Sequence, residues 1–510
     1  MRRNLRAAAI AAVLTSTLVV PTPGWASSRP VAEDRVSALT WETCPPPLIE
    51  RDPRQQCATL PVPLDYRSPG GRSIDLVVSR IASAKPGMRR GVLVLNTGGP
   101  ADIGVDAPSF LAPLMPADLT DRFDLVSFDP RGVGSSAPIS CHFPDVPAEI
   151  GQRYPDVDGS IDRNIAFARD LAQRCGRNVG DVLPFITTAN TARDLDRIRA
   201  ALGEPRISYL GYSYGTYLGA VYRTLYPHRA DRFVLDSSYD PALTRYQQLR
   251  LPSLGAALRL PDFTGWAAAR NERYGLGATA AAVQSTFDAL TAALDATPLT
   301  LPDGTVLTGN LLRIVTFEGI YRDAGFPALA ETWQALADAT ATGHVPAALS
   351  MFGGTGPAAA APIPADNQPS VQVAIHCNDD TWPRDVATYR RNVTLDRRIF
   401  PATAGFPANI WACAFWPAPR IEPAVRVHGT GSRSVLIVQN LRDPATPWIS
   451  AVGMRRALGS DAVLLSVDQG GHTAYLTTNS TCANDTTTAF LTRGVLPSGP
   501  RLCPGQPLPA

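Results

Sequence analysis

One stretch of the chain, residues 207–225, constrains the possible fold more than any other. The short apolar run ISYL leads directly into the pentapeptide GYSYG, and apolar residues at helical spacing follow it. Gly211 and Gly215 allow a tight turn at which a strand and a helix approach each other closely. This strand, turn and helix would expose the hydroxyl of Ser213 at the turn, an arrangement typical of a nucleophile elbow.

Other apolar runs of strand length flank this stretch on both sides. They cover residues 91–95, 123–128, 233–235, 434–438 and 462–467. Short, continuously apolar strands between helical patterns predict a mostly parallel sheet with helices on both faces. We expect Thr191 to cap the helix that precedes the elbow, because Asp194 stands in the capping-box position.

Between about residues 240 and 430 the pattern changes from strands to helices. Val283, Phe287 and Leu290 share one helical face, and strand signals are sparse in this stretch. The sequence therefore predicts a mainly helical cap, residues 240–430, inserted into one sheet. Residues 27–239 and 431–510 would form the two parts of the core that carries the sheet.

The first 26 residues resemble an export signal. Arg2, Arg3 and Arg6 give a positive start, an apolar run follows from Ala7 to Val20, and small residues lead to Ala26. The apolar run is too short to span a bilayer stably. We therefore expect a secreted protein without a stable membrane anchor, from which residues 1–26 are removed as a signal peptide.

Composition excludes several functional classes. The 510 residues are 45% hydrophobic and 18% charged, which predicts a globular chain with a sizeable core. A net charge of +2 without a basic stripe argues against a nucleic-acid partner. The eight cysteines include no CxxC pair, which argues against zinc or redox chemistry, and we expect neither metal nor organic cofactor.

The even number of cysteines agrees with an oxidising compartment and predicts disulfides. Eight cysteines allow 105 pairings, and sequential pairing is the simplest of them. It would join Cys44 to Cys57, Cys141 to Cys175, Cys377 to Cys413 and Cys482 to Cys503.

A serine hydroxyl is a weak nucleophile, so Ser213 needs a base. Of the six histidines, His472 is the best placed, because it follows the apolar run 462–467 near the C-terminus. Loops at the carboxyl ends of parallel strands form the ligand-binding edge of such sheets. His228, at a helix end, is expected to be a surface residue instead.

The base in turn needs a carboxylate to orient it. Asp443 follows the apolar run 434–438, and the chain order Ser213, Asp443, His472 is that of α/β-hydrolases. The sequence therefore predicts an α/β-hydrolase fold. Asp236, at the end of an earlier apolar run, is the alternative acid, whereas Asp468 lies too near His472 along the chain to be preferred.

Negative charge that develops on the substrate oxygen needs hydrogen-bond donors. The backbone N–H of Tyr214, directly after the serine, is one expected donor. The other is Gly99 in the turn NTGGP, where the lack of a side chain lets the backbone approach the substrate. The alternative is an ordinary Gly-Gly-Pro turn without a chemical role.

Several segments together resemble the tripeptidyl aminopeptidase-like branch of secreted α/β-hydrolases, which is similar to proline iminopeptidases. They are LVLNTGGP, FDPRGVGSS, GYSYGTYLG, FVLDS, RDPATP and GGH. The resemblance covers most of the chain after residue 26, and residues from about 400 onward match the C-terminal segment of that branch. It implies Ser213, Asp443 and His472 as the triad, and exopeptidase activity on short peptides with a free N-terminus.

The chain departs from this branch after Pro100. The family usually continues as GGPGGSG, whereas this sequence reads GGPADIG and places Asp102 in the loop. Asp102 could contact a substrate amine or cap the following turn, and we expect the second. Two carboxylates of the predicted cap, Glu318 and Asp379, are candidates for binding a peptide amine, with a surface or structural role as the alternative.

The predicted function is thus a secreted serine exopeptidase that acts on peptides. An esterase or amidase that acts on a small molecule with the same triad is the alternative. A binding protein without catalysis is a third hypothesis, which the intact triad disfavours.

Overall fold

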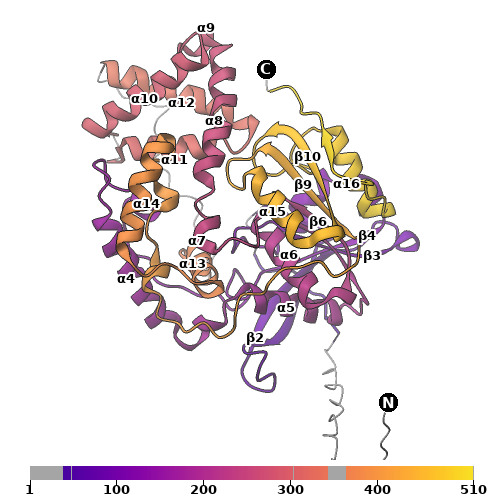
Figure 1. Ribbon diagram of the computed structural model, residues 1–510. Coiled ribbons are helices and arrows are strands. Elements are labelled where there is room, and N and C mark those ends of the chain that lie inside the picture. Colours follow the sequence, from indigo (N-terminus) through magenta and orange to yellow (C-terminus); the bar gives the residue numbers. More distant parts are fainter. Residues whose placement is uncertain (1–37, 47–48, 302–303, 343–362, 509–510) are drawn as a thin grey trace, which may run out of the picture. The chain divides into compact units, whose positions relative to one another are not determined.

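Nine strands form one sheet in the computed structural model, which describes residues 38–46, 49–301, 304–342 and 363–508. Their order is β1-β2-β4-β3-β5-β6-β9-β10-β11 (Figure 1). The pairs β1/β2 and β2/β4 are antiparallel, and all other neighbours are parallel. The strands are β1 (Gln56–Pro63), β2 (Ser73–Ile81), β3 (Gly91–Asn96), β4 (Phe123–Phe128), β5 (Ile207–Tyr212), β6 (Ala230–Asp236), β9 (Val435–Arg442), β10 (Ala462–Gly470) and β11 (Arg501–Cys503).

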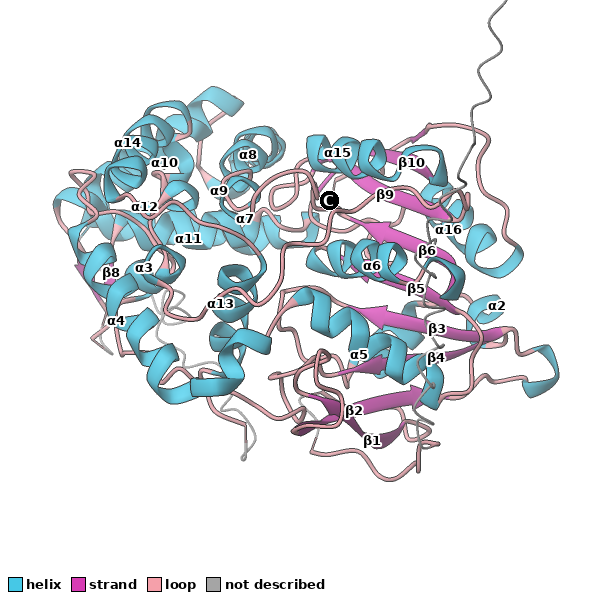
Figure 2. Cartoon of the chain, turned by 60° about the horizontal axis from the view of Figure 1, so that its bottom comes forward, coloured by secondary structure: helices cyan, strands magenta, loops and turns pink. Residues whose placement is uncertain are grey.

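The mostly parallel sheet confirms the predicted fold class, and every apolar run that was predicted as a strand is one. Helices α1 (Ala107–Leu111), α2 (Ala117–Thr120) and α16 (Thr481–Arg493) pack against one face, where Leu93, Leu210 and Leu436 are fully buried. Helices α5 (Thr188–Ala201), α6 (Tyr214–Leu225) and α15 (Trp448–Leu458) lie on the other side of the sheet (Figure 2).

The helix before the elbow begins one turn earlier than predicted. The N-cap is Thr187, whose side chain accepts the N–H of Asn190. The prediction that Thr191 caps α5 is wrong, because its hydroxyl lies inside the helix and donates to the Thr187 carbonyl at 3.0 Å. Asp194 forms a fully buried ion pair with Arg131 at 2.6 Å, so a long-range contact rather than capping explains it.

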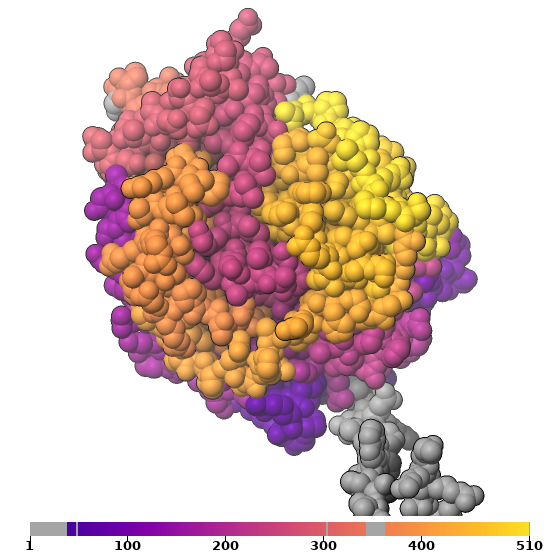
Figure 3. Space-filling view, in the orientation of Figure 1, coloured from indigo at the N-terminus to yellow at the C-terminus, as the bar shows by residue number. Residues whose placement is uncertain are grey.

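The chain between β6 and β9 is mainly helical, and its surface lies beside that of the C-terminal strands and helices (Figure 3). We call its helices, α7 to α14, the cap helices. The cap helices are α7 (Arg245–Gln248), α8 (Pro252–Ala268), α9 (Asn271–Tyr274), α10 (Ala280–Ala296), α11 (Gly309–Gly319), α12 (Phe326–Thr342), α13 (Asn367–Asp379) and α14 (Val386–Ile399). Two helices from earlier in the chain are α3 (Ala148–Gly151) and α4 (Asp162–Val179). A hairpin of β7 (Leu299–Thr300) and β8 (Val306–Leu307) joins α10 to α11.

The cap helices have an apolar core of their own. Phe263 packs edge-on against Trp333, and Phe287 stacks on the same ring. Helices α3 and α4 precede the elbow in the chain, yet α3 contacts α11 (Figure 2). Chain from the first part of the predicted core therefore also packs against the cap helices.

Four disulfides confirm the predicted sequential pairing. They are Cys44–Cys57, Cys141–Cys175, Cys377–Cys413 and Cys482–Cys503. The predicted signal peptide, residues 1–26, lies outside the described residues. Within the described ranges no helix combines the length and the hydropathy that a bilayer crossing requires.

Candidate active site

The turn around Ser213 is as tight as its glycines indicate. Strand β5 ends at Tyr212, α6 begins at Tyr214, and Ser213 between them has a φ of 54°. A Cβ on Gly215 would lie 2.4 Å from Oδ1 of Asn96, and a Cβ on Gly211 would lie 2.6 Å from the Gly215 carbonyl oxygen. Only glycine fits at both positions, so the close packing of strand and helix fixes the serine at the sheet edge.

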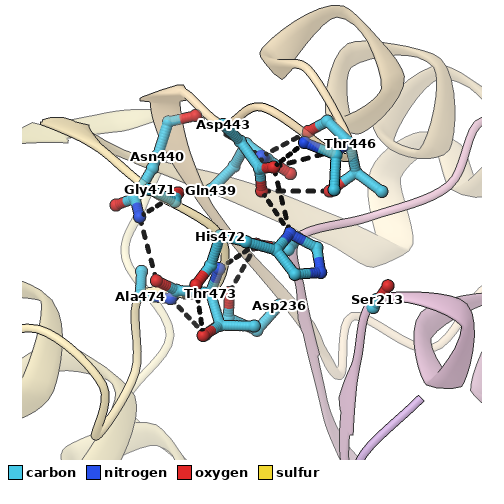
Figure 4. Close-up of polar contacts among 12 residues, drawn as sticks. Ser213, Asp236, Gln439, Asn440, Asp443, Thr446, Gly471, His472, Thr473 and Ala474 are labelled. Carbon is cyan, nitrogen blue, oxygen red and sulfur yellow. Dashed lines mark hydrogen bonds and ion pairs between the residues drawn. The ribbon is translucent and has the colours of Figure 1, made fainter. Parts of the chain in front are cut away.

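His472 and Asp443 form a close pair beside this turn (Figure 4). The imidazole Nδ1 lies 3.0 Å from each carboxylate oxygen of Asp443. An Nδ1–H that donates to Asp443 leaves Nε2 unprotonated and able to accept a proton. Figure 4 shows Ser213 on the side of the ring away from Asp443.

Among the described residues, the Ser213 hydroxyl and His472 are not hydrogen-bonded to each other. Such contacts are commonly long in enzymes without substrate and shorten when the substrate binds. The order of the three groups, hydroxyl, imidazole and carboxylate, is the order that proton transfer from a serine requires.

Asp443 is fully buried and amply hydrogen-bonded. Its carboxylate accepts the N–H groups of Ala445 at 2.8 Å and Thr446 at 2.9 Å, and the amide of Gln439 at 3.2 Å. Burial acts to raise the pKa of Asp443, but the charge of His472 and these hydrogen bonds outweigh it and hold the pKa below its ordinary value. Asp443 is therefore ionised and can stabilise a protonated imidazole.

The alternative acid, Asp236, does not contact the imidazole. Its carboxylate accepts the N–H groups of Ala474 at 3.0 Å and Tyr475 at 2.6 Å, just beyond His472. Burial raises the pKa of Asp236 to about 7. Asp236 holds the loop that carries His472, whereas Asp468 is bound to Arg442 at 2.7 Å.

Two further residues, neither of them predicted from the sequence, hold this loop in place. The Asn440 amide donates to the carbonyl oxygens of Gly471 at 2.8 Å and Thr473 at 2.9 Å. From the cap helices' side, the Tyr321 carbonyl accepts the N–H of His472 at 2.7 Å. Asn440 lies in β9, three residues before Asp443, and this position was the available signal.

The turn after β3 lies directly beside the nucleophile. A Cβ on Gly98 would lie 3.0 Å from the Cβ of Ser213, and Gly98 and Gly99 have φ values of 107° and 97°. In the described part of the chain, neither the Gly99 N–H nor the Tyr214 N–H has a hydrogen-bond partner. Both donors are therefore available to a substrate oxygen at this edge.

Asp102 does not cap the turn that follows it, so this expectation is wrong. No backbone N–H of the described residues donates to its carboxylate. Instead, Oδ1 accepts the side-chain amide of Gln368 on α13 at 3.0 Å. Burial raises the pKa of Asp102, while Gln368 and the charge of His472 act in the opposite direction.

Of the two carboxylates expected in the cap, Asp379 is already occupied by internal partners. It accepts the N–H of Thr188 at 2.8 Å and its hydroxyl at 2.5 Å, and it lies 3.7 Å from the guanidinium of Arg245. The Thr188 hydroxyl also contacts the hydroxyl of Tyr214. Through the Thr188 hydroxyl, Asp379 is therefore linked to Tyr214, the residue after the nucleophile.

Glu318 stands apart from the triad, at the exposed surface of α11. It lines a cavity of about 730 Å³ together with Tyr321 and Arg322. The same two residues line a second cavity, of about 310 Å³, that reaches His472. Glu318 therefore lines the neighbouring cavity and not the one that reaches His472. Among the described residues, no group of three metal-ligating side chains could hold a metal ion.

Comparison with known proteins gives consistent matches. Residues 402–503 match a family model described as TAP-like protein. Over 481 residues the chain is 35% identical to the tripeptidyl aminopeptidase of Streptomyces lividans, covering 90% of this chain and 85% of that protein. It is 31% identical to the serine protease Hip1 of Mycobacterium tuberculosis, with 88% and 87% covered. It is 30% identical to a carboxylesterase B of the same organism, with 94% and 89% covered.

Proposed function

This chain belongs to the TAP-like family of α/β-hydrolases, and we propose that it is a serine exopeptidase that hydrolyses peptide bonds near a free N-terminus. The observation that carries the proposal is the His472–Asp443 pair at 3.0 Å beside the elbow serine. The similarity to a tripeptidyl aminopeptidase over most of both chains supports the peptide substrate.

In the proposed first step, Ser213 attacks the scissile carbonyl while Nε2 of His472 takes its proton. Asp443 keeps the imidazole in the required tautomer and stabilises its positive form, because it is ionised and five donor groups hold its carboxylate in place. His472 then protonates the leaving amine, and an acyl group remains on Ser213. Water attacks this ester with His472 again as the base, and the free enzyme returns.

We assign the oxyanion donors to the N–H groups of Gly99 and Tyr214. Both come from turns that abut Ser213, and neither has another partner among the described residues. Removal of one such donor in a serine hydrolase commonly lowers kcat about 10²- to 10³-fold.

The test of the proposed nucleophile is Ser213→Ala, with Ser285→Ala on the exposed surface of α10 as the matched control. Ser213→Ala should lower kcat on peptide substrates by about 10⁴-fold or more and abolish labelling by a fluorophosphonate probe, with an unchanged Tm. Ser285→Ala should keep both. Full labelling of Ser213→Ala would reject Ser213, and absence of labelling of the wild type would favour a binding protein without catalysis.

The second candidate is an esterase or amidase that acts on a small molecule with the same triad. It is favoured by the 30% identity to a carboxylesterase B. Peptides with a free amine, assayed against their N-acetylated forms, separate the two. A strong preference for the free amine supports the exopeptidase, and equal kcat/KM values for both forms support the esterase.

We also propose that the enzyme is secreted after removal of residues 1–26, and that residues 240–430 act as the cap over its substrate site. Four disulfides agree with an oxidising compartment. N-terminal sequencing of the secreted protein tests the first point, since a start at Ser27 is expected.

A further inference from the structure

Asp102 is a carboxylate that the proposed mechanism does not use, although it lies next to the oxyanion donors. Its Oδ1 would be 3.1 Å from a Cβ on Gly99, and Gly98 is in turn packed against the Cβ of Ser213. The charge of His472 acts on the pKa of Asp102, and the charge of Asp102 acts on the pKa of Tyr239. These neighbours locate the carboxylate at the rim of the reaction site.

The carboxylate is also left without a cation. Within the part of the chain that the structure describes, its one hydrogen bond comes from the neutral amide of Gln368, and no arginine, lysine or histidine forms an ion pair with it. Half-buried carboxylates without a positive partner are costly, since burial removes hydration that nothing replaces. A positively charged group of a substrate would therefore find a complementary charge at this position.

A negative charge on Asp102 would also slow catalysis unless a positive group of the substrate lies beside it. The transition state places a negative charge on the oxygen that Gly99 would bind, and a second negative charge on Asp102 repels it. At separations of about 5–8 Å and an effective dielectric constant of about 20, this repulsion corresponds to about thirty- to three-hundredfold in rate. A substrate that brings a positive group to Asp102 removes this penalty, and a neutral substrate does not.

We propose that Asp102 is a specificity-determining residue that binds the free α-ammonium group of the peptide beside the oxyanion site. This inference rests on the proposed peptidase function. Gln368 orients the carboxylate from α13, so a cap helix takes part in the recognition of the amine. Asp102 then selects substrates twice, through attraction to the ammonium group and through repulsion that slows turnover of neutral substrates.

The other two carboxylates explain the selectivity less well. The carboxylate of Asp379 accepts hydrogen bonds from Thr188 and lies beside the guanidinium of Arg245, so it already has a positive partner. Glu318 lines the cavity next to that of His472, and no residue of the oxyanion turn is among the described residues that line this cavity. Asp102 alone among the three combines an unpaired charge with a place at Gly99.

The test compares Asp102→Asn with the wild type on coumarin amides of alanine, dialanine and trialanine, each with a free and an N-acetylated N-terminus. Asp288→Asn, which removes the same charge from the exposed surface of α10, is the matched control. Asp102→Asn should lower kcat/KM for the best free-amine substrate at least tenfold. It should raise kcat/KM for the N-acetylated partner about tenfold or more, because the charge that repels the oxyanion is gone, and Asp288→Asn should change neither.

Two outcomes overturn the inference. If Asp102→Asn keeps the wild-type ratio of free to acetylated kcat/KM, the carboxylate does not bind the amine. If both values fall in parallel, Asp102 merely supports the turn. A wild type that shows no preference for the free amine overturns the proposed exopeptidase itself, so the two failures are distinguishable.

Gln368→Leu provides a second variant in case Asp102→Asn does not fold. It keeps the charge and removes its orienting partner, so KM for the free-amine substrate should rise severalfold while kcat/KM for the acetylated one stays constant. An unchanged KM for the free amine would count against the inference. The Tm and the rate of fluorophosphonate labelling verify the fold and the nucleophile in every variant.

Discussion

At the scale of single residues, Ser213 is held in a conformation that an unrestrained chain would avoid. A φ of 54° is rare for a residue other than glycine, and such positions cost about 1–3 kcal/mol each. The surrounding bonds maintain it, because the Ser213 N–H donates to the Asp236 carbonyl at 2.9 Å and its own carbonyl accepts the Thr216 hydroxyl at 2.6 Å. The backbone of Asp236 thus supports the serine, while its side chain supports the histidine loop.

The division of labour between the two buried aspartates gives a prediction. Asp443→Asn should lower kcat about 10⁴-fold, because an amide next to Nδ1 favours the wrong tautomer of His472 and cannot stabilise the imidazolium. Asp236→Asn is the matched control and should lower kcat less than about tenfold, since an amide oxygen can still accept the N–H groups of Ala474 and Tyr475. Steady-state kinetics on one peptide substrate measure both.

An equal loss of activity in the two variants would show that the histidine loop, rather than the charge on Asp443, limits the rate. A Tm within a few degrees of the wild type is required of each variant for this comparison.

At the scale of elements, three helix ends meet behind the nucleophile. Asp379 is the last residue of α13, Thr188 the first of α5, and Tyr214 the first of α6. The carboxylate accepts an N–H from the positive end of α5, which is favourable, and the Thr188 hydroxyl bridges Asp379 and Tyr214. A cap helix is in this way joined to the two core helices that flank the elbow.

Thr188→Val tests this junction. It leaves two buried polar groups, on Asp379 and Tyr214, without one of their partners, so the free energy of unfolding should fall by about 1–3 kcal/mol. Thermal unfolding should show a Tm a few degrees lower, with kcat reduced because Tyr214 also supplies an oxyanion donor. Thr191→Val is the matched control on the same helix, since its hydroxyl bonds only to Thr187. Equal effects of both variants would assign the loss to helix α5 alone.

The strands that could be predicted from the sequence are those buried on both faces. β3 and β4 are buried throughout and are therefore continuously apolar. β1 and β2 were missed because they alternate between exposed and buried positions, and Pro61 and Pro63 further mask the first of them. β11 has three residues, too few for any pattern.

The candidate site divides in the same way. Ser213, Asp443 and His472 follow strands in a recognisable order, so local sequence suggests them. The bond from Gln368 to Asp102 joins residues 266 positions apart, and the role of Asp379 depends on Thr188, which is 191 positions away. Contacts of this kind are decided by packing, and one sequence carries no local signal for them.

At the scale of the whole molecule, the four disulfides lie toward the two ends of the described chain and at α13, whereas residues 176–376 carry none. Cys44–Cys57 fastens the segment before β1, Cys141–Cys175 fastens α4, Cys377–Cys413 fastens α13, and Cys482–Cys503 ties α16 to β11. Each bond limits the freedom of the unfolded chain, by an amount that grows slowly with the loop it closes.

The loop lengths allow a prediction. Cys377–Cys413 spans 36 residues and Cys44–Cys57 spans 13, so chain entropy assigns them about 4 and about 3 kcal/mol. Replacing both cysteines of a pair by alanine should lower Tm in either case, more for the longer loop. Only the Cys377–Cys413 variant should also lose peptidase activity, because α13 carries Gln368 and Asp379. Equal loss of activity in both variants would contradict this difference.

The hydrogen bond from the backbone of His472 to the Tyr321 carbonyl has a consequence for turnover. The main chain of the general base, His472, is hydrogen-bonded to the segment that follows α11. A peptide that displaced this segment on entry would also displace the backbone of His472, because the two are hydrogen-bonded. This one hydrogen bond thus couples the place where a substrate would enter to the position of the proton acceptor.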